Sequence, residues 1–265
     1  MPSHEQNYET WNSFYDWSRY GGDEWSAKWG GTDMQWYWSI LPRIRRFLPV
    51  ETILDLGPGY GRWARYLREY CSRMVLVDLS EKCIHACKQK FGTENISYRV
   101  GDGQSLGPIQ DRSVDFVFSW ETLVYCEQPA VESYLRDLKK VLKDTGTAFL
   151  HHSNLASYSS YFQWTLKVPK AWRDRLKKRG LLDFDQWRAR TVTAESFKSA
   201  AEACGLYVHT QELVPWGGKR LIDCFTTLSA QPPERPFKRL ENPDLHNRAY
   251  HIQRLSRLYG EGVPW

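Results

Sequence analysis

Residues 53–63 constrain the fold of this 265-residue chain more than any other segment. They read Ile-Leu-Asp-Leu-Gly-Pro-Gly-Tyr-Gly-Arg-Trp, an apolar run typical of a buried strand, a turn with three glycines and the start of a helix. Glycines permit positive φ and let backbone N–H groups approach a ligand, while the helix N-terminus attracts negative charge. This order of elements predicts a nucleotide-like ligand at the carboxyl edge of an α/β sheet.

The spacing of the three glycines indicates the class of ligand. Gly57, Gly59 and Gly61 follow the pattern Gly-x-Gly-x-Gly, whereas dinucleotide-binding proteins use Gly-x-Gly-x-x-Gly. This difference disfavours a nicotinamide-dependent oxidoreductase, which we keep as an alternative. Asp78 ends the next predicted strand, about 20 residues further on, where a carboxylate can accept both hydroxyls of a ribose.

The surrounding sequence alternates short apolar or β-branched runs with amphipathic helices. This alternation predicts a doubly wound, mainly parallel sheet with helices on both faces. Helical spacing of apolar residues predicts helices over residues 63–70 and 131–142. Seven strands are expected at residues 52–56, 74–79, 96–100, 114–119, 147–152, 206–213 and 221–228.

Two further motifs follow strands at the same edge of the predicted sheet. Residues 101–104 read Gly-Asp-Gly-Gln, a short polar turn placed to hydrogen-bond the edge of an adenine. Residues 120–125, which follow the fourth strand, are polar and aromatic. Because the carboxyl ends of parallel strands meet at one edge, all these motifs are expected to line one site.

Taken in order, the motifs of residues 51–152 resemble the class I S-adenosylmethionine-dependent methyltransferases. The resemblance implies a Rossmann-like sheet of seven strands, one of them antiparallel, and S-adenosylmethionine as cofactor. It implies that Asp55 and residues 57–61 hold the methionine end of the donor, Asp78 the ribose, and residues 102–104 the adenine. The alternative is that the acidic residues only cap turns. The predicted cofactor-binding residues are Asp55, Gly57, Pro58, Gly59, Gly61, Arg62, Asp78, Leu79, Asp102, Gly103, Gln104, Ser119, Trp120 and Trp36.

Two histidines end the fifth predicted strand, beside the expected methyl donor. A histidine near its ordinary pKa can take the proton of a hydroxyl as the oxygen attacks. Strand alternation sends His151 and His152 to opposite faces, so one at most is expected to be the base, and we favour His152 because it lies nearer the carboxyl end. Glu121 and Tyr125 are the other candidates, and a histidine held by backbone groups is the structural alternative.

Aromatic residues make up 15% of the chain, and ten of them fall within residues 11–38. Such rings suit a lid over a ligand or a platform for sugars, or else a helical layer packed on the sheet. Residues 25–38, 41–44, 151–154 and 216–224 together are similar to bacterial methyltransferases of glycan and secondary-metabolite pathways. We therefore expect O-methylation of a hydroxyl on a saccharide or sugar-bearing metabolite. Methylation of a nitrogen or acid group and a non-catalytic cofactor-binding protein are the alternatives.

Metal, partners and location are less constrained. A magnesium ion is not indicated, because the adjacent acidic pair expected beside the acceptor is missing, with Glu121 and Glu127 the nearest carboxylates. The six scattered cysteines are interpreted as reduced core residues. The net charge of +5 is small and is not concentrated in one long basic run, which argues against nucleic acid as a partner. No apolar run is long enough for a membrane span or a signal peptide, so a cytoplasmic location is expected; a homo-oligomer stays open.

The chain is expected to contain one elaborated α/β domain. Residues 1–48 form the predicted aromatic cap and residues 49–230 the methyltransferase core, with an insertion at about residues 155–192. The proline-rich residues 231–265 form a C-terminal extension.

Overall fold

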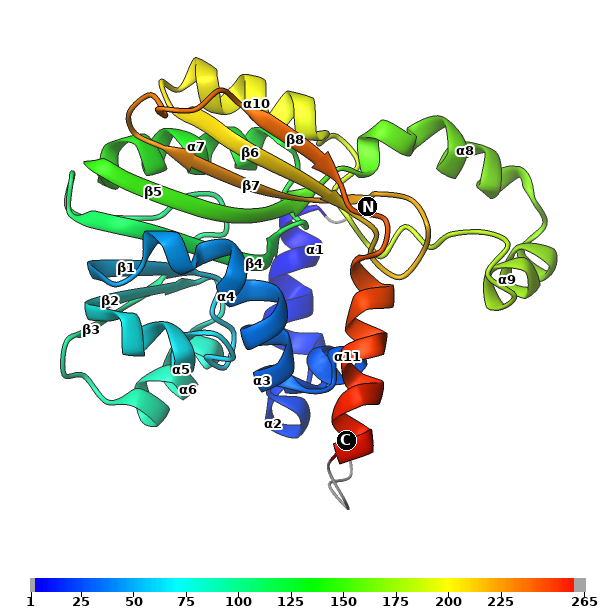
Figure 1. Cartoon of the computed structure of the whole chain (residues 1–265), viewed down its shortest axis with the longest axis horizontal. Helices are drawn as coiled ribbons and strands as arrows, with labels where there is room; N and C mark the ends of the chain where they lie inside the picture. Colours follow the sequence, from blue (N-terminus) through cyan, green and yellow to red (C-terminus); the bar gives the residue numbers. More distant parts are fainter. Residues whose placement is uncertain (1–2, 260–265) are drawn as a thin grey trace.

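A computed structural model describes residues 3–259 and contains one eight-stranded sheet in the order β3-β2-β1-β4-β5-β7-β6-β8 (Figure 1). Pairing is parallel from β3 to β5, and β7 runs antiparallel to both of its neighbours. The predicted α/β, mainly parallel architecture is thereby confirmed. The strands are β1 (Val50–Leu56), β2 (Cys71–Asp78), β3 (Ile96–Val100), β4 (Val114–Leu123), β5 (Leu142–Ser153), β6 (Tyr207–Val214), β7 (Asp223–Ser229) and β8 (Lys238–Glu241).

The predicted strand number of seven is wrong, because β8 adds an eighth strand at the edge. It pairs parallel with β6, from Thr210 opposite Lys238 to Leu213 opposite Glu241. All four residues of β8 are exposed, so no burial pattern marks the segment in the sequence. Its charged side chains are typical of an edge strand that must not pair further.

Helices cover both faces of the sheet, as a doubly wound fold requires. The predicted helix over residues 63–70 is a short α-helix followed by a 3₁₀ turn, and that over residues 131–142 belongs to α7. The helices are α1 (His4–Glu9), α2 (Trp17–Tyr20), α3 (Thr32–Met34), α4 (Leu41–Ile44), α5 (Ala64–Leu67), α6 (Glu81–Phe91), α7 (Gln128–Val141), α8 (Ser159–Lys167), α9 (Lys170–Lys178), α10 (Ala194–Ala203) and α11 (Leu245–Tyr259).

Two hydrophobic cores lie on the two faces of the sheet. Neighbouring residues of β1 divide between them, because successive side chains of a strand point to opposite faces. Ile53 belongs to the core that includes Trp36 and Ile44 of the N-terminal segment, whereas Leu54 belongs to the core that includes Leu138 of α7 and Phe197 of α10. The N-terminal segment therefore forms part of the layer on one face of the sheet, together with α5 and α6.

Three parts of the chain depart from the simple alternation of strands and helices. The N-terminal helices and α11 lie together beside the carboxyl ends of the strands (Figure 1), where the Gln253 amide donates to the carbonyl of Ala27 (3.3 Å). Helices α8 and α9 project from the body on the opposite side from β3 (Figure 1). Within residues 3–259, no helix has both the length and the apolar composition that crossing a bilayer requires. Residues 1–2 of the predicted cap and 260–265 of the predicted extension lie outside the described part.

Candidate active site

A cavity of about 230 Å³ lies at the carboxyl ends of β1, β2 and β4. Open α/β sheets bind ligands at this edge. Its walls come from the glycine loop, the turn after β3, the end of β4 and the N-terminal segment. The sequence-predicted residues that line it are Gly57, Pro58, Gly59, Arg62, Asp78, Leu79, Gly103, Gln104, Trp120, Glu121 and Tyr125.

The glycine loop needs glycine at two positions for both conformation and space. Gly57 and Gly59 adopt φ of +77° and +56°, a region that other residues enter only with strain. A Cβ atom on Gly57 would overlap the side chain of Thr122, and one on Gly59 would lie 2.9 Å from the ring of Trp17. The loop backbone is thus closely packed between β4 and the N-terminal segment.

Gly61 has a different role from the one predicted. Its φ is +76°, and a Cβ atom there would lie 2.5 Å from the ring of Phe91 at the end of α6. Gly61 therefore allows close packing of the loop on α6, and it does not line the cavity.

Asp78 connects the end of β2 to the glycine loop. Its carboxylate accepts hydrogen bonds from the backbone N–H groups of Gly59 (3.0 Å) and Ser80 (2.8 Å). Burial raises the pKa of Asp78 to about 6, although these hydrogen bonds oppose the rise. The carboxylate lines the cavity and keeps acceptor capacity for a ligand hydroxyl.

Asp55 is buried at the end of β1, two residues before the loop. Its Oδ2 atom has no hydrogen-bond partner among the described residues. Burial, together with the nearby charge of Asp78, raises the pKa of Asp55 to about 8, against the opposing effect of Arg62. Asp55 does not line the cavity, but the next residue, Leu56, does. A cation bound nearby would stabilise the ionised form of this buried carboxyl group.

Three other predicted cofactor-binding residues do not line the cavity. The carboxylate of Asp102 accepts from backbone N–H groups of its own turn, so it shapes the turn that carries Gln104. The hydroxyl of Ser119 donates to the carbonyl of Leu56 (3.1 Å) inside the sheet. Trp36 is buried in the core, where it stacks on Tyr66 at a centroid distance of 4.9 Å.

Glu121 lies within β4, two residues before the end of the strand, and lines the cavity. Its φ of +58° is a strained value for a residue with a side chain, of the kind found at functional sites. One carboxylate oxygen lies 2.5 Å from Nη2 of Arg62. Burial would raise the pKa of Glu121, but the nearby guanidinium charges, that of Arg62 first and then that of Arg188, outweigh it and lower the pKa. The side chain is therefore a carboxylate held at the cavity wall.

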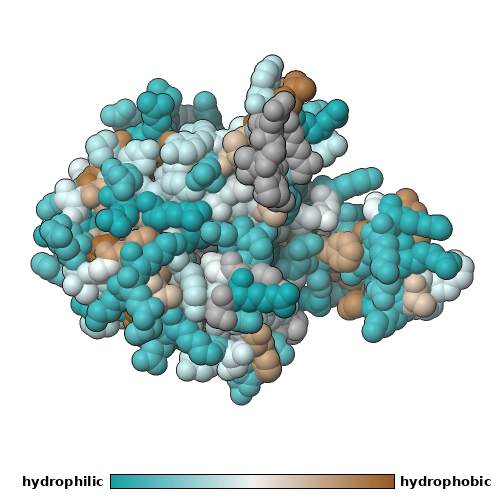
Figure 2. Space-filling view, turned by 90° about the horizontal axis from the view of Figure 1, so that it is seen from below, coloured by the Kyte–Doolittle hydropathy of each residue, from teal (hydrophilic) through white to brown (hydrophobic). Residues whose placement is uncertain are grey.

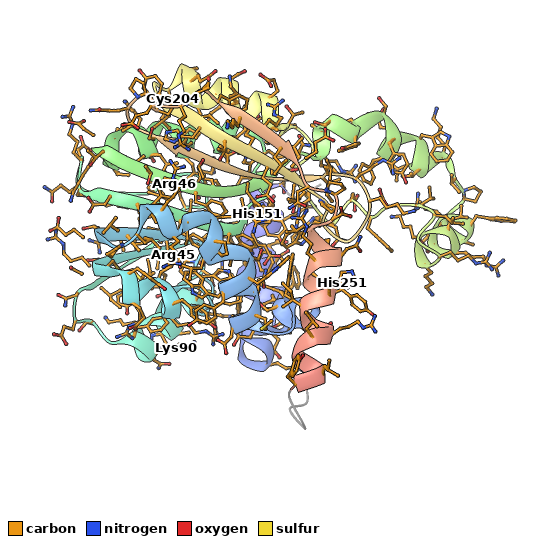
Figure 3. The ribbon with its side chains drawn as sticks, viewed as in Figure 1. Arg45, Arg46, Lys90, His151, Cys204 and His251 are labelled. Atoms are coloured by element: carbon orange, nitrogen blue, oxygen red, sulfur yellow. The ribbon has the colours of Figure 1, made fainter. Side chains whose placement is uncertain are left out.

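His151, labelled in Figure 3, is buried, and both of its ring nitrogens are engaged. The backbone N–H of Glu121 donates to Nδ1 (3.2 Å), and Nε2 lies 2.9 Å from Oδ2 of Asp223. An accepting Nδ1 places the proton of a neutral ring on Nε2, which donates to Asp223. Burial lowers the pKa of His151 despite the neighbouring carboxylate. His151 consequently positions the Glu121 backbone and offers no free nitrogen to an acceptor.

The preference for His152 as base is wrong, because its side chain faces the opposite core. Its ring stacks on Phe197 of α10 at 3.7 Å, and its nitrogens lie 2.7 Å from the Thr226 hydroxyl and 2.9 Å from the Ser153 carbonyl. Burial lowers its pKa to about 3. The alternation that separates the two histidines was predicted correctly, but proximity to the strand end does not decide which face is the site.

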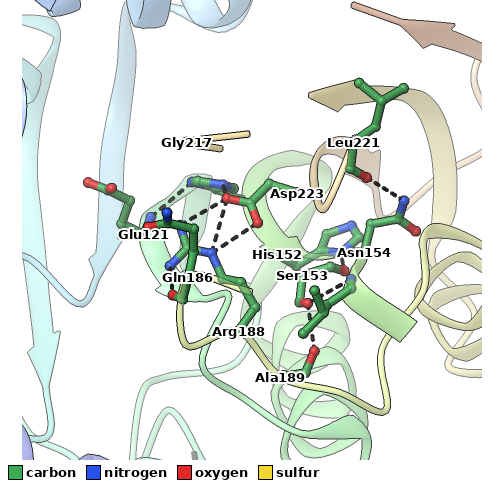
Figure 4. A network of polar contacts seen from close by, with 12 residues as sticks. Glu121, His152, Ser153, Asn154, Gln186, Arg188, Ala189, Gly217, Leu221 and Asp223 are labelled. Atoms are coloured by element: carbon green, nitrogen blue, oxygen red, sulfur yellow. Dashed lines mark hydrogen bonds and ion pairs between the residues drawn. The ribbon is translucent and has the colours of Figure 1, made fainter. Parts of the chain in front are cut away.

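A buried ion pair supports His151 and was missed by the sequence analysis. Arg188 donates to both carboxylate oxygens of Asp223, at 2.9 and 3.0 Å, and both side chains are almost fully buried (Figure 4). Burial would raise the pKa of Asp223, but the charge of Arg188 lowers it to about 2. The residues lie in no common motif, so only the fold brings them together. A continuous polar chain thus runs from Arg188 through Asp223 and His151 to Glu121.

The N-terminal segment contributes aromatic rings to the cavity wall. Trp11, Trp17 and Trp25 line the cavity, and Trp17 stacks on Tyr60 at 5.2 Å. Asn7 donates from its side chain to the carbonyl of Tyr125 (2.9 Å), which fixes α1 over the end of β4. The aromatic excess was the sequence signal for these rings. Tyr60 and Thr122 also line the cavity and lie in motifs that were expected there, whereas His4 and Asn7 carried no signal.

Within residues 3–259, no three His, Cys, Asp or Glu side chains lie together in an arrangement that could hold a metal ion. Of the two carboxylates closest to the predicted acceptor, Glu121 pairs with Arg62, and Glu127 accepts from the backbone of Arg190 and Thr191.

Residues 54–150 match the family model described as a methyltransferase domain. The chain is 31% identical over 113 residues to a malonyl-[acyl-carrier protein] O-methyltransferase of Marinomonas sp., covering 40% of this chain and 41% of that protein. It is 30% identical over 118 residues to phosphoethanolamine N-methyltransferase 1 of Triticum aestivum, covering 42% and 24%. The chain therefore spans less than half the length of these curated relatives.

The fold is shared with a solved SAM-dependent methyltransferase from Methanosarcina mazei. The TM-score is 0.53 at 16% identity, and the superposition covers 72% of this chain and 98% of that one. At this identity the likeness concerns the fold. Residues 54–150 are thus similar to a methyltransferase domain, and they lie within an α/β fold that is shared with a SAM-dependent methyltransferase.

Proposed function

We propose that the protein is an S-adenosylmethionine-dependent methyltransferase that acts on a small-molecule acceptor. The observation that carries the proposal is one cavity that joins the glycine loop to Asp78, Glu121 and a cap of tryptophans. When bound, S-adenosylmethionine supplies a methyl group made electrophilic by its sulfonium. The residues fit such a donor: Asp78 would accept from the ribose hydroxyls, and the backbone of the glycine loop would lie against the donor. The unpaired oxygen of Asp55 would balance the charge of the ammonium group of the donor.

The acceptor is proposed to enter beside Glu121, between rings of the N-terminal segment. Glu121 would take the proton of the attacking group while the site holds that group in line with the methyl, about 3–3.5 Å away. A saccharide hydroxyl is the proposed acceptor, since Trp11, Trp25 and Tyr125 offer flat apolar faces at the cavity. The named relatives include both an O- and an N-methyltransferase, so an amine is the second candidate.

The N-terminal residues 1–48 are proposed to act as a cap on the donor, with residues 49–230 as the core. The proposed insertion at about residues 155–192 brings Arg188 to the site, and residues 231–265 are the proposed extension. Contacts of Trp17 with the glycine loop and of Asn7 with β4 support the assignment of the cap.

Calorimetric titration tests the donor assignment directly. We expect S-adenosylmethionine and its demethylated product to bind, and NAD not to bind. Replacing Asp78 by Ala should weaken donor binding by about 1.5–3 kcal/mol, because charge-assisted hydrogen bonds to the ribose are lost. Asp144→Ala, which removes an exposed carboxylate paired with Arg112, is the matched control and should bind the donor normally. Tighter binding of NAD would contradict the proposal, and donor binding without turnover of any acceptor would indicate a binding protein.

The pH dependence of donor affinity tests the role of Asp55. Its pKa of about 8 means that the carboxyl is mostly protonated in the free protein near neutrality. A bound ammonium group would favour the ionised form, so binding should release a proton and tighten as the pH rises between about 6 and 7.5. Asp55→Asn should abolish most of this dependence and leave a weaker one near pH 6 from Asp78. Equal pH profiles for the parent and Asp55→Asn would show that Asp55 does not sense the donor.

A further inference from the structure

Helices α8 and α9 form a projecting arm, defined as residues 159–182, that holds the excess positive charge of the chain. One acidic residue, Asp174, accompanies seven basic ones in this segment, giving a net charge of +6. The whole chain carries +5, so the remainder is close to neutral. The basic residues are Lys167, Lys170, Arg173, Arg175, Lys177, Lys178 and Arg179.

Large apolar side chains are exposed among these charges. Trp164 and Trp172 are 53% and 64% exposed, and Leu166 and Leu181 are exposed to a similar extent. In the space-filling view the arm is a separate lobe on which hydrophobic and hydrophilic residues alternate (Figure 2). Several large apolar side chains exposed on one projecting segment are costly in water, so they indicate a contact surface.

The base of the arm is firmly attached to the body. Phe162 is buried in the core, and the guanidinium of Arg220 lies 3.1 Å from the centroid of the Tyr161 ring. The Tyr161 hydroxyl also accepts from the backbone N–H of Asp183 (3.0 Å). The structure therefore presents the arm in a fixed direction, with the outer helix α9 burying none of its residues.

We propose that the arm docks the protein on an anionic lipid surface. Tryptophan and leucine side chains next to lysine and arginine are the combination that inserts into the headgroup region while the cations contact acidic lipids. A nucleic acid would complement the charge but not the leucines. A second copy of the arm would complement the apolar side chains but bring six further positive charges against the first six. An anionic bilayer complements both features.

Vesicle co-sedimentation tests this docking at about 0.1 M salt, with vesicles of phosphatidylcholine alone and with about 30% phosphatidylserine. The parent protein should bind the mixed vesicles and not the neutral ones. The triple variant Lys170→Glu/Arg175→Glu/Lys178→Glu should bind about 100-fold more weakly, since each cation near the surface contributes severalfold. Trp172→Ala should bind about tenfold more weakly at unchanged charge, because a buried aromatic contact is lost.

The control for charge is Arg45→Glu/Lys88→Glu/Lys90→Glu, which alters three exposed cations of the body; Figure 3 labels Arg45 and Lys90 away from the arm. This variant should bind mixed vesicles within about threefold of the parent. Circular dichroism and donor titration should be unchanged in every variant, which separates this test from that of the methyltransferase proposal. Failure of the parent to bind mixed vesicles, or equal binding by the arm variant, would overturn the proposal. Binding of duplex DNA in place of vesicles would overturn it too and assign the arm to nucleic acid.

Discussion

Replacing Glu121 by Gln is expected to lower kcat by about 10²–10⁴-fold, the usual contribution of a positioned base. The change keeps the size of the side chain but removes the carboxylate that the cavity presents. Because the pKa of Glu121 is lowered by the charges of Arg62 and Arg188 despite its burial, activity in the parent should persist down to the acidic side of the ordinary glutamate range. Donor affinity should change little. Steady-state rates against pH, once an acceptor is found, provide the measurement.

The control for this experiment is Glu195→Gln, which alters an exposed carboxylate paired with Arg239 and should leave kcat unchanged. His152→Ala should not alter the pH profile, since its ring faces the other core. Full activity of the Glu121 variant would show that positioning alone suffices or that Tyr125 takes the proton, and Tyr125→Phe would separate these two cases.

Replacing Arg188 by Met should lower the free energy of unfolding by about 3–5 kcal/mol, the typical cost of leaving a buried charge without its partner. Asp223 would remain in a site with almost no solvent exposure, bonded to His151 alone. Because the pKa of Asp223 is depressed to about 2, the pair's contribution is present above the ordinary aspartate range and lost as the pH falls through that value. Urea unfolding at neutral pH measures the loss.

Two further variants identify the cause of that loss. Arg188→Met/Asp223→Leu removes both charges and should recover most of the stability, since an apolar pair of similar volume often replaces a buried ion pair without cost. Arg190→Met disrupts a half-exposed pair with Asp185 and should cost about 0–1 kcal/mol. If the double variant were as unstable as Arg188→Met, the loss would come from packing and not from the charge of Asp223.

The part of the cavity formed by the glycine loop and Asp78 could be predicted from sequence because its geometry is local. Gly57 and Gly59 lie in one turn, and Asp78 is joined to that turn by a hydrogen bond across neighbouring strands. Spacing along the chain therefore reports spacing in the fold. The prediction failed for Gly61, which shares the motif but packs on Phe91. A sequence motif indicates the path of the backbone, but it does not show which residues of the motif line the cavity.

The part of the cavity around Glu121 depends on contacts between distant segments, which sequence patterns do not report. Alternation shows that His151 and His152 face opposite sides, but the identity of each side depends on whether α10 or the N-terminal segment covers it. Trp36 illustrates the same limit, because its burial against Tyr66 cannot be distinguished in sequence from a ring at the cavity. The edge strand β8 was missed because all of its residues are exposed, so its sequence has no alternation of apolar and polar residues.

The Arg188–Asp223 pair also restricts the paths along which this sequence can diverge. A change at either position alone passes through a protein with an orphaned internal charge, and in a domain of ordinary stability such an intermediate is close to unfolding. The two positions are therefore expected to be inherited as a unit, kept together or exchanged together. His151 is expected to vary together with this pair, since its hydrogen-bonded partners are Asp223 and the backbone of Glu121. An alignment of descendants should show this as joint variation of residues 35 positions apart.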